Sequence, residues 1–110
     1  MDARLLWGTL EMLILDVVSH APTYGYAISQ AVLDRSRGYF ELKEGSLYPA
    51  LHRLERQGLL RSSWAETDDA RRRKYYRLTP AGRRMLAERR NEWEKFTGAV
   101  KGVLGHECEA

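Results

Sequence analysis

The chain has 110 residues, of which 44% are hydrophobic and 30% charged, and its formal net charge is +3. This length fits one domain with a modest core, and such a domain gains from burying further surface against a partner, so we expect an oligomer. No apolar run approaches the length of a bilayer span, the N-terminus lacks the order of a secretory signal, and the single cysteine cannot form an intrachain disulfide, so the sequence predicts a cytoplasmic protein without a membrane segment.

Two helices are expected at the start of the chain. Apolar residues recur at helical spacing from about Leu5 to Val18, and Ala21-Pro22 ends this first helix. Thr23 is a plausible N-cap for a second helix over about Tyr24 to Ser36, which Gly38 terminates.

A third helix follows after a short extended piece. Ser46 is expected to cap it, Pro49 falls in its first turn, and Gly58 closes it. Its two faces differ, because the leucines lie in one narrow sector and the polar residues gather on the opposite one. The apolar sector holds Leu47, Leu51 and Leu54, the opposite face holds Pro49, His52, Arg53 and Arg56, and Tyr48 lies at the margin. A helix that reads DNA needs this division, although an ordinary amphipathic surface helix shows it as well.

A hairpin and a long helix complete the chain. Leu60 to Glu66 is predicted as a strand, Thr67 to Arg73 as a polar turn and Lys74 to Leu78 as the returning strand. Thr79-Pro80 is an N-cap followed by proline at the first helical position, and the pattern stays helical to about Leu104.

This order of elements is that of a mainly α fold, a winged helix-turn-helix with an added C-terminal helix. We expect residues 1–79 to form the DNA-binding domain and residues 80–110 to form a dimerisation helix and tail.

Positive charge is concentrated in the third helix and the hairpin. Between Gly45 and Arg77 eight basic residues stand against four acidic ones, a local net charge of +4, whereas the rest of the chain carries −1. Such asymmetry indicates a polyanionic partner, although exposed arginines also serve to keep a small domain soluble. Four consecutive cations lie at or beside the predicted hairpin tip: Arg71, Arg72, Arg73 and Lys74. A basic hairpin tip and a polar helix face could contact a duplex at two places at once, which favours double-stranded DNA as the partner.

The C-terminal helix carries an apolar seam. Leu86, Trp93 and Val100 repeat every seven residues, and Phe96 and Val103 follow three positions later. Two such seams could pair in a homodimer. Arg89 is the one charged interruption of the seam, and Trp7 on the first helix could complete the contact.

Several stretches closely resemble the PadR family of bacterial transcriptional regulators. They are GTLEMLIL from Gly8, the Tyr24-Gly25-Tyr26 motif, EGSLYPALHRLE from Glu44, KYYRLT from Lys74 and WEKFTGAV from Trp93, and the wording is most similar to the short, acidobacterial-type branch. The resemblance implies a homodimeric repressor on a partly palindromic promoter site, with the third helix in the major groove and the wing on the backbone. It places Ser46, Tyr48 and Pro49 at the head of the reading helix and Lys74 on the wing.

Trp93 has two interpretations. In drug-sensing members of that family a tryptophan on this helix lines a cavity between subunits, and Trp93 resembles it; with Phe96 and Trp7 it would suit a small planar aromatic ligand. Alternatively, Trp93 and Phe96 only fill the dimer core, as aromatic stripes at helical spacing usually do.

Enzyme and metal functions are not indicated. His20, His52 and His106 are dispersed, His106 and Cys108 lack a second ligand pair, and no phosphate-binding loop or catalytic triad is recognisable, so we expect no catalysis and no cofactor. The remaining alternative to a DNA-binding repressor is a winged-helix module that contacts protein and never DNA.

Overall fold

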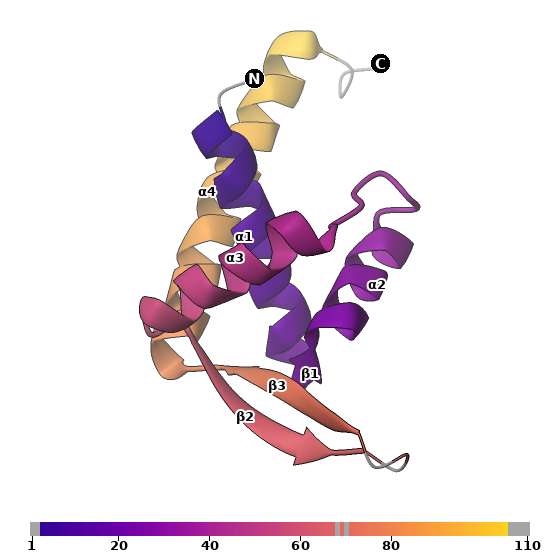
Figure 1. Ribbon diagram of the computed structural model, residues 1–110. Helices are drawn as coiled ribbons and strands as arrows, with labels where there is room; N and C mark the ends of the chain where they lie inside the picture. The colour runs from indigo at the N-terminus through magenta and orange to yellow at the C-terminus, as the bar shows by residue number, and fades with distance from the viewer. Residues whose placement is uncertain (1–2, 68, 70, 106–110) are drawn as a thin grey trace.

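The computed structural model describes residues 3–67, 69 and 71–105, with side chains from Gly8 onward. Figure 1 shows the order of its elements: α1 (Ala3–His20), β1 (Thr23–Tyr24), α2 (Gly25–Arg35), α3 (Glu44–Arg56), β2 (Leu60–Glu66), β3 (Arg72–Leu78) and α4 (Pro80–Leu104). The predicted class, a mainly helical winged helix-turn-helix, is confirmed. The three N-terminal helices pack above a small antiparallel sheet of order β1-β3-β2, and α4 runs along α1 away from the sheet.

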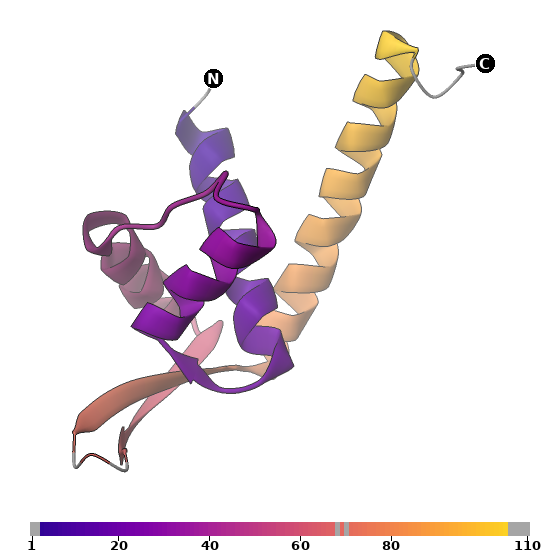
Figure 2. The same ribbon diagram turned by 90° about the vertical axis from the view of Figure 1, so that its right-hand side faces the viewer.

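The core lies between α1, α2, α3 and the sheet. Its fully buried side chains come from every layer: Ile14 and Leu15 from α1, Ile28 from α2, Leu51 and Leu54 from α3, Leu60 from β2 and Tyr76 from β3. The first turns of α4 join this core through Leu86, whereas the distal turns leave it, and Figure 2 shows α4 diverging from α1 toward its C-terminal end.

Thr23 belongs to a strand, so its predicted role as a helix cap was wrong. Thr23 pairs with Tyr76 and Tyr24 with Tyr75, which makes β1 the outer strand beside β3. Helix α2 therefore begins at Gly25, and its N-cap Tyr24 makes no side-chain capping bond. A strand of two residues is too short to show any periodicity, and only the free edge of β3 makes it a strand.

Helix α3 begins three residues earlier than predicted, because its N-cap is Lys43 and not Ser46. Its first residue is Glu44 and its N-cap is Lys43, whose carbonyl accepts hydrogen bonds from the backbone N–H groups of Ser46 and Leu47 at 2.9 and 2.8 Å. Ser46 is therefore inside the first turn and not its cap, and Pro49 lies inside the helix. Proline is tolerated there at the loss of one intrahelical bond, the one that its missing N–H would have made to the carbonyl of Gly45.

The hairpin matches its predicted position closely. Strand β2 has the predicted bounds, but β3 begins at Arg72, so Arg72 and Arg73 are strand residues paired with Glu66 and Ala65 and not part of the turn. Continued pairing with β2 extends β3 beyond the residues whose side chains favour a strand.

Helix α4 starts and ends as predicted. The Thr79 hydroxyl accepts a hydrogen bond from the Gly82 N–H at 2.9 Å, Pro80 follows it, and Gly105 ends the helix with a φ of 77°. Gly82 is required where α4 crosses the chain between α3 and β2, because a Cβ there would collide with the carbonyl oxygen of Leu59.

Candidate nucleic-acid interface

The face of α3 opposite its leucines is open to solvent. Pro49, His52 and Arg56 are exposed, Tyr48 is at the margin as predicted, and Ser46 is half-buried in the first turn. The leucines beneath are almost completely buried, so the helix is held by one side and presents the other.

Arg53 differs from its neighbours on this face because it pairs with a buried acid. Its Nε lies 3.4 Å from Oε2 of Glu11 on α1, and its side chain is only about one-third exposed, at 34%. The other oxygen of Glu11 accepts a hydrogen bond from Nη1 of Arg89 on α4 at 3.2 Å, and the same Nη1 reaches the Gly8 carbonyl. One carboxylate therefore links the predicted reading helix to the C-terminal helix. A contact between Arg53 and DNA stays a prediction.

The wing is attached to α3 through Glu55. Its Oε2 accepts a hydrogen bond of 2.5 Å from the Ser62 hydroxyl, and its Oε1 lies 3.5 Å from the Lys74 ammonium. The Ser62 hydroxyl, helped by the charge of Lys74, holds the pKa of the Glu55 carboxyl below its ordinary value against the opposing effect of desolvation. This contact sets the position of the hairpin relative to the exposed face of α3.

The outer cations of the wing rest on aromatic rings. The Arg72 guanidinium lies 5.1 Å from the centre of the Trp64 ring, and the Arg73 guanidinium lies 4.3 Å from that of Tyr24. Arg71, at the end of the turn, pairs with Asp69 at 3.5 Å. An aromatic ring carries no net charge that could offset the cation above it, whereas the carboxylate of an ion pair offsets the positive charge of its partner. Arg72 and Arg73 therefore contribute positive charge to their surroundings.

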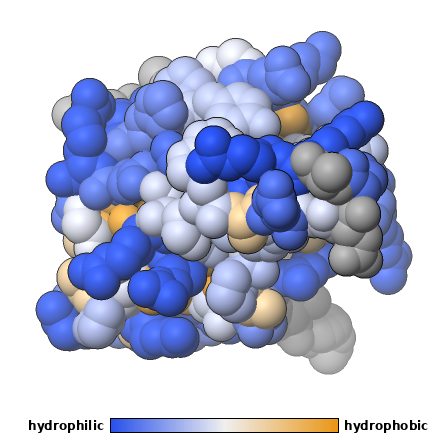
Figure 3. Space-filling model, turned by 60° about the horizontal axis from the view of Figure 1, so that its bottom comes forward, coloured by the Kyte–Doolittle hydropathy of each residue, from blue (hydrophilic) through white to orange (hydrophobic). Residues whose placement is uncertain are grey.

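A groove of about 700 Å³ separates the wing from α3 and the start of α2. It is lined by Tyr24, Gly25, Tyr26, Tyr48, His52, Trp64, Arg71, Arg72, Arg73, Lys74 and Tyr76. Seen from the hairpin side, the surface is mostly hydrophilic with small apolar patches between (Figure 3). The structure thus brings six of the ten predicted DNA-binding residues to one concavity: Tyr48, His52, Arg71, Arg72, Arg73 and Lys74.

Sequence reasoning did not assign Tyr24, Tyr26 or Trp64 to this site. The Tyr24-Gly25-Tyr26 motif was a signal that could have found it, because the Tyr48 ring lies against Gly25. A Cβ on Gly25 would lie 2.7 Å from the Tyr48 hydroxyl oxygen. The glycine therefore lets the Tyr48 ring lie against the first turn of α2.

The apolar seam of α4 is only partly free. Leu86 was predicted in a dimer contact, but it is buried in the core of its own chain, because the first turns of α4 pack on the helices and the sheet. Beyond it the seam is exposed at Trp93, Phe96, Val100 and Val103. The Trp93 and Phe96 rings stack with centres 5.8 Å apart. The side chain of Trp7 lies outside the described side chains.

A hollow of about 270 Å³ adjoins Trp93. It is lined by Met12, Leu13, Asp16, Arg90, Trp93 and Glu94, and the Arg90 guanidinium is 3.0 Å from the Asp16 carboxylate. Phe96 does not line it. Half of its lining residues are charged: Asp16, Arg90 and Glu94. The aromatic ligand pocket between subunits that the sequence suggested stays a prediction.

Comparison with known proteins agrees with this geometry. Residues 14–88 match the family model described as the transcriptional regulator PadR-like family. The chain belongs to the PadR-like family of transcriptional regulators. Members of this family regulate transcription by binding DNA, and this is therefore the broad function of this chain.

Individual transcriptional regulators resemble most of the chain. The transcriptional regulator Rv3488 of Mycobacterium tuberculosis is 38% identical over 92 residues, which cover 84% of this chain and 85% of that protein. A PadR-like transcriptional regulator from Bacillus cereus has a crystal structure with a TM-score of 0.80 and 30% identity, covering 92% of this chain and 96% of its own. A PadR-like transcription factor from Bacteroides fragilis has a TM-score of 0.77 and 33% identity, covering 92% and 95%.

Among the described residues no three His, Cys, Asp or Glu side chains come together as metal ligands; His106 and Cys108 lie outside them. None of the helices in the described part of the chain combines the length and hydropathy that crossing a bilayer requires.

Proposed function

We propose that this PadR-like protein is a sequence-specific transcriptional repressor that binds a partly palindromic promoter site as a homodimer. The observation that supports this most is the groove between α3 and the wing, whose described lining residues include four cations and no carboxylate. In this proposal Ser46, Tyr48, Pro49, His52, Arg53 and Arg56 belong to the helix in the major groove. Arg71, Arg72, Arg73 and Lys74 neutralise the phosphates beside it.

Dimerisation is proposed through the distal half of α4. Trp93, Phe96, Val100 and Val103 form an exposed apolar stripe that a second copy would cover, with Trp7 as a further candidate. Residues 1–79 would then read DNA, and residues 80–110 would set the distance between the two reading helices, about 34 Å for adjacent half-sites. A repressor of this kind works on chromosomal DNA, which places the proposed activity in the cytoplasm.

DNA binding is tested by fluorescence anisotropy with a duplex from the upstream region of the gene. Arg56→Ala should change the base preference, whereas Arg71→Ala should weaken binding to all sequences and lower the slope of log Kd against log salt by about one. Arg84→Ala, on the exposed side of α4, is the control with the same loss of charge. Wild-type protein that binds no duplex at low salt would favour the second candidate, a winged-helix module that binds another protein.

Relief of repression by a small aromatic ligand is a separate part of the proposal. The hollow beside Trp93, enlarged by a partner's seam, would hold such a ligand, and the ligand must favour the arrangement that cannot bind DNA. Titration of planar aromatic compounds should then quench the emission of wild-type protein and leave Trp93→Phe unaffected. A panel that changes the emission of neither protein would contradict ligand binding and leave DNA binding untouched.

A further inference from the structure

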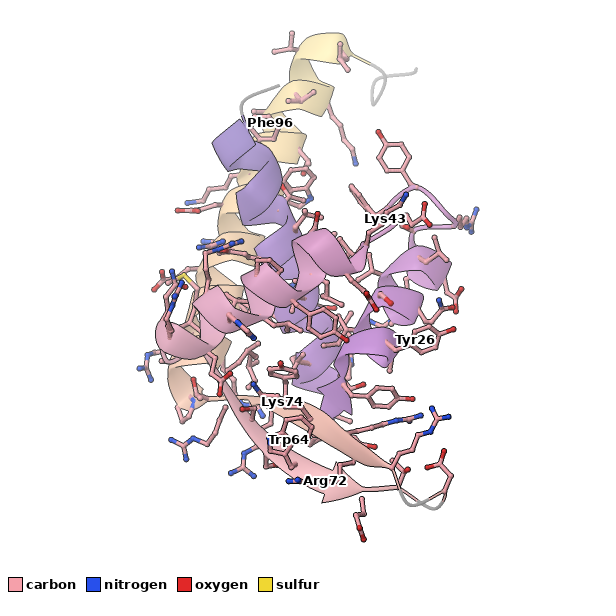
Figure 4. The ribbon with its side chains drawn as sticks, in the orientation of Figure 1. Tyr26, Lys43, Trp64, Arg72, Lys74 and Phe96 are labelled. Carbon is pink, nitrogen blue, oxygen red and sulfur yellow. The ribbon has the colours of Figure 1, made fainter. Side chains whose placement is uncertain are left out.

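Trp64 is a large aromatic side chain held in an exposed position on the wing. It is 58% exposed, whereas Leu60, four residues earlier on the same face of β2, is buried in the core. Alternation along the strand aims both side chains toward the helices, but at Trp64 the hairpin extends past the helical layer. The indole therefore borders the groove and does not reach the core, as Figure 4 shows for Trp64 and Arg72.

Arg72 and Trp64 form a unit. Arg72 is paired with Glu66 across the strands, yet its guanidinium lies over the indole ring and not in an ion pair with that acid among the described contacts. Stacking holds the guanidinium in one place while leaving its N–H donors and its charge for another group. The pair thus presents a fixed cation directly beside a flat apolar surface.

The rest of the groove indicates which partner this pair meets. Tyr48 and His52 line the groove and also belong to α3, so it is continuous with the proposed reading face. Opposite the wing, Tyr26 on α2 is 66% exposed. A DNA strand offers phosphates for the cations and, between them, deoxyribose rings with apolar faces for the aromatic side chains. An acidic protein segment would match the charges but has no reason to need continuity with α3.

We propose that Trp64 and Arg72 together bind the sugar–phosphate backbone of one DNA strand beside the wing. Arg72 takes a phosphate oxygen, and the indole of Trp64 packs on the adjacent deoxyribose. This inference rests on the proposed function, and it adds to the wing a contact that is apolar and independent of base sequence.

The salt dependence of DNA binding distinguishes the contribution of Trp64 from that of Arg72. Trp64→Ala should weaken binding to specific and unrelated duplexes alike, by roughly fivefold, which is the lower end of the range for aromatic rings stacked on bases. The slope of log Kd against log salt should stay at the wild-type value, because no cation is lost. Arg72→Gln should instead lower that slope by about one. Tyr39→Ala, an exposed aromatic residue between α2 and α3 and outside the groove lining, is the matched control and should bind as wild type.

Fluorescence locates the contact. Adding duplex to wild-type protein should change the tryptophan emission, and Trp64→Phe should remove most of that change, since Trp7 and Trp93 belong to α1 and α4. The inference is overturned if wild-type protein binds the duplex while Trp64→Ala binds it equally well. It is also overturned if polyglutamate quenches Trp64 while DNA does not, which would assign the groove to an acidic protein. A wild-type protein that binds no duplex would instead refute the proposed function itself.

Discussion

Helices α3 and α4 carry similar apolar patterns with opposite outcomes. In α3, Leu47, Leu51 and Leu54 are 3%, 0% and 0% exposed. In the distal half of α4, Phe96, Val100 and Val103 are 51%, 40% and 87% exposed. The apolar stripe of α3 is buried by other elements of the same chain. The apolar stripe of α4 continues beyond those elements, so its distal residues stay exposed.

A helical repeat of apolar residues can serve either to pack a helix within its own chain or to bind another surface. The repeat itself does not tell which of the two it does. Covering the leucines of α3 fixes that helix and leaves His52 and Arg56 exposed on its other side, so the proposed DNA-binding face is formed within one chain. The distal apolar residues of α4 are not buried within one chain and so do not stabilise its fold, and their burial requires another surface. The comparison can be tested at each helix in turn.

The largest effect is expected in the core beneath α3. Leu54→Ala should lower the free energy of unfolding by about 2–5 kcal/mol, because it leaves a cavity among fully buried side chains. Val103→Ala should change it by less than about 1 kcal/mol at low protein concentration, where a dimer would be dissociated. Urea denaturation at two protein concentrations measures both. Equal losses for the two variants would show that the helices do not differ in this way.

A charge on the α4 stripe should act on assembly and leave the fold intact. Phe96→Glu should weaken the proposed dimer by about 3 kcal/mol, roughly 100-fold in Kd, since it removes apolar contact and buries a charge. Asn91→Glu introduces the same group on the opposite side of the helix and is the control. Sedimentation measures the association. A wild-type chain that stays monomeric at micromolar concentration would contradict the dimer itself.

Removing the charge of Glu11 tests the link between α3 and α4. Glu11→Gln should lower the free energy of unfolding by about 1–2 kcal/mol, because Arg53 and Arg89 lose their common partner but stay partly hydrated. It should also raise affinity for unrelated duplexes, since Arg53 keeps its charge without the acid beside it. Glu92→Gln, exposed on α4, matches the change in charge. If both variants bind DNA alike, only the net charge matters and Glu11 does not restrain Arg53.

The smallest effect concerns the attachment of the wing to α3 through Glu55. In the folded protein the pKa of Glu55 lies below its ordinary value of 4.5. The ionised carboxylate therefore stabilises the fold fully above pH 4.5, and this stabilisation is lost as the pH falls through the folded pKa. The difference in unfolding midpoint between wild type and Glu55→Gln should therefore be larger at pH 7 than at pH 3. A difference that does not change with pH would exclude an ionised Glu55 as the anchor.

Much of the fold could be predicted because its signals are local. The start of α4 at Thr79-Pro80, the bounds of β2 and the two faces of α3 follow from capping, alternation and period. The contacts within the site were harder to predict from the sequence. Arg53 pairs with a residue 42 positions away. Trp64 lies in a strand that was predicted with the right bounds, but nothing in the sequence indicates that this end of the strand is exposed to solvent.

The amino-acid sequence by itself determined the helices, the hairpin, the concentration of positive charge and the resemblance to a family of regulators, because each depends on neighbours within a few residues. Only the tertiary structure decided that Thr23 and Tyr24 pair with β3, that Leu86 is covered and Phe96 is not, and that aromatic rings support Arg72 and Arg73. These outcomes depend on which distant segment packs against a residue in the folded chain, and local propensity carries no information about that.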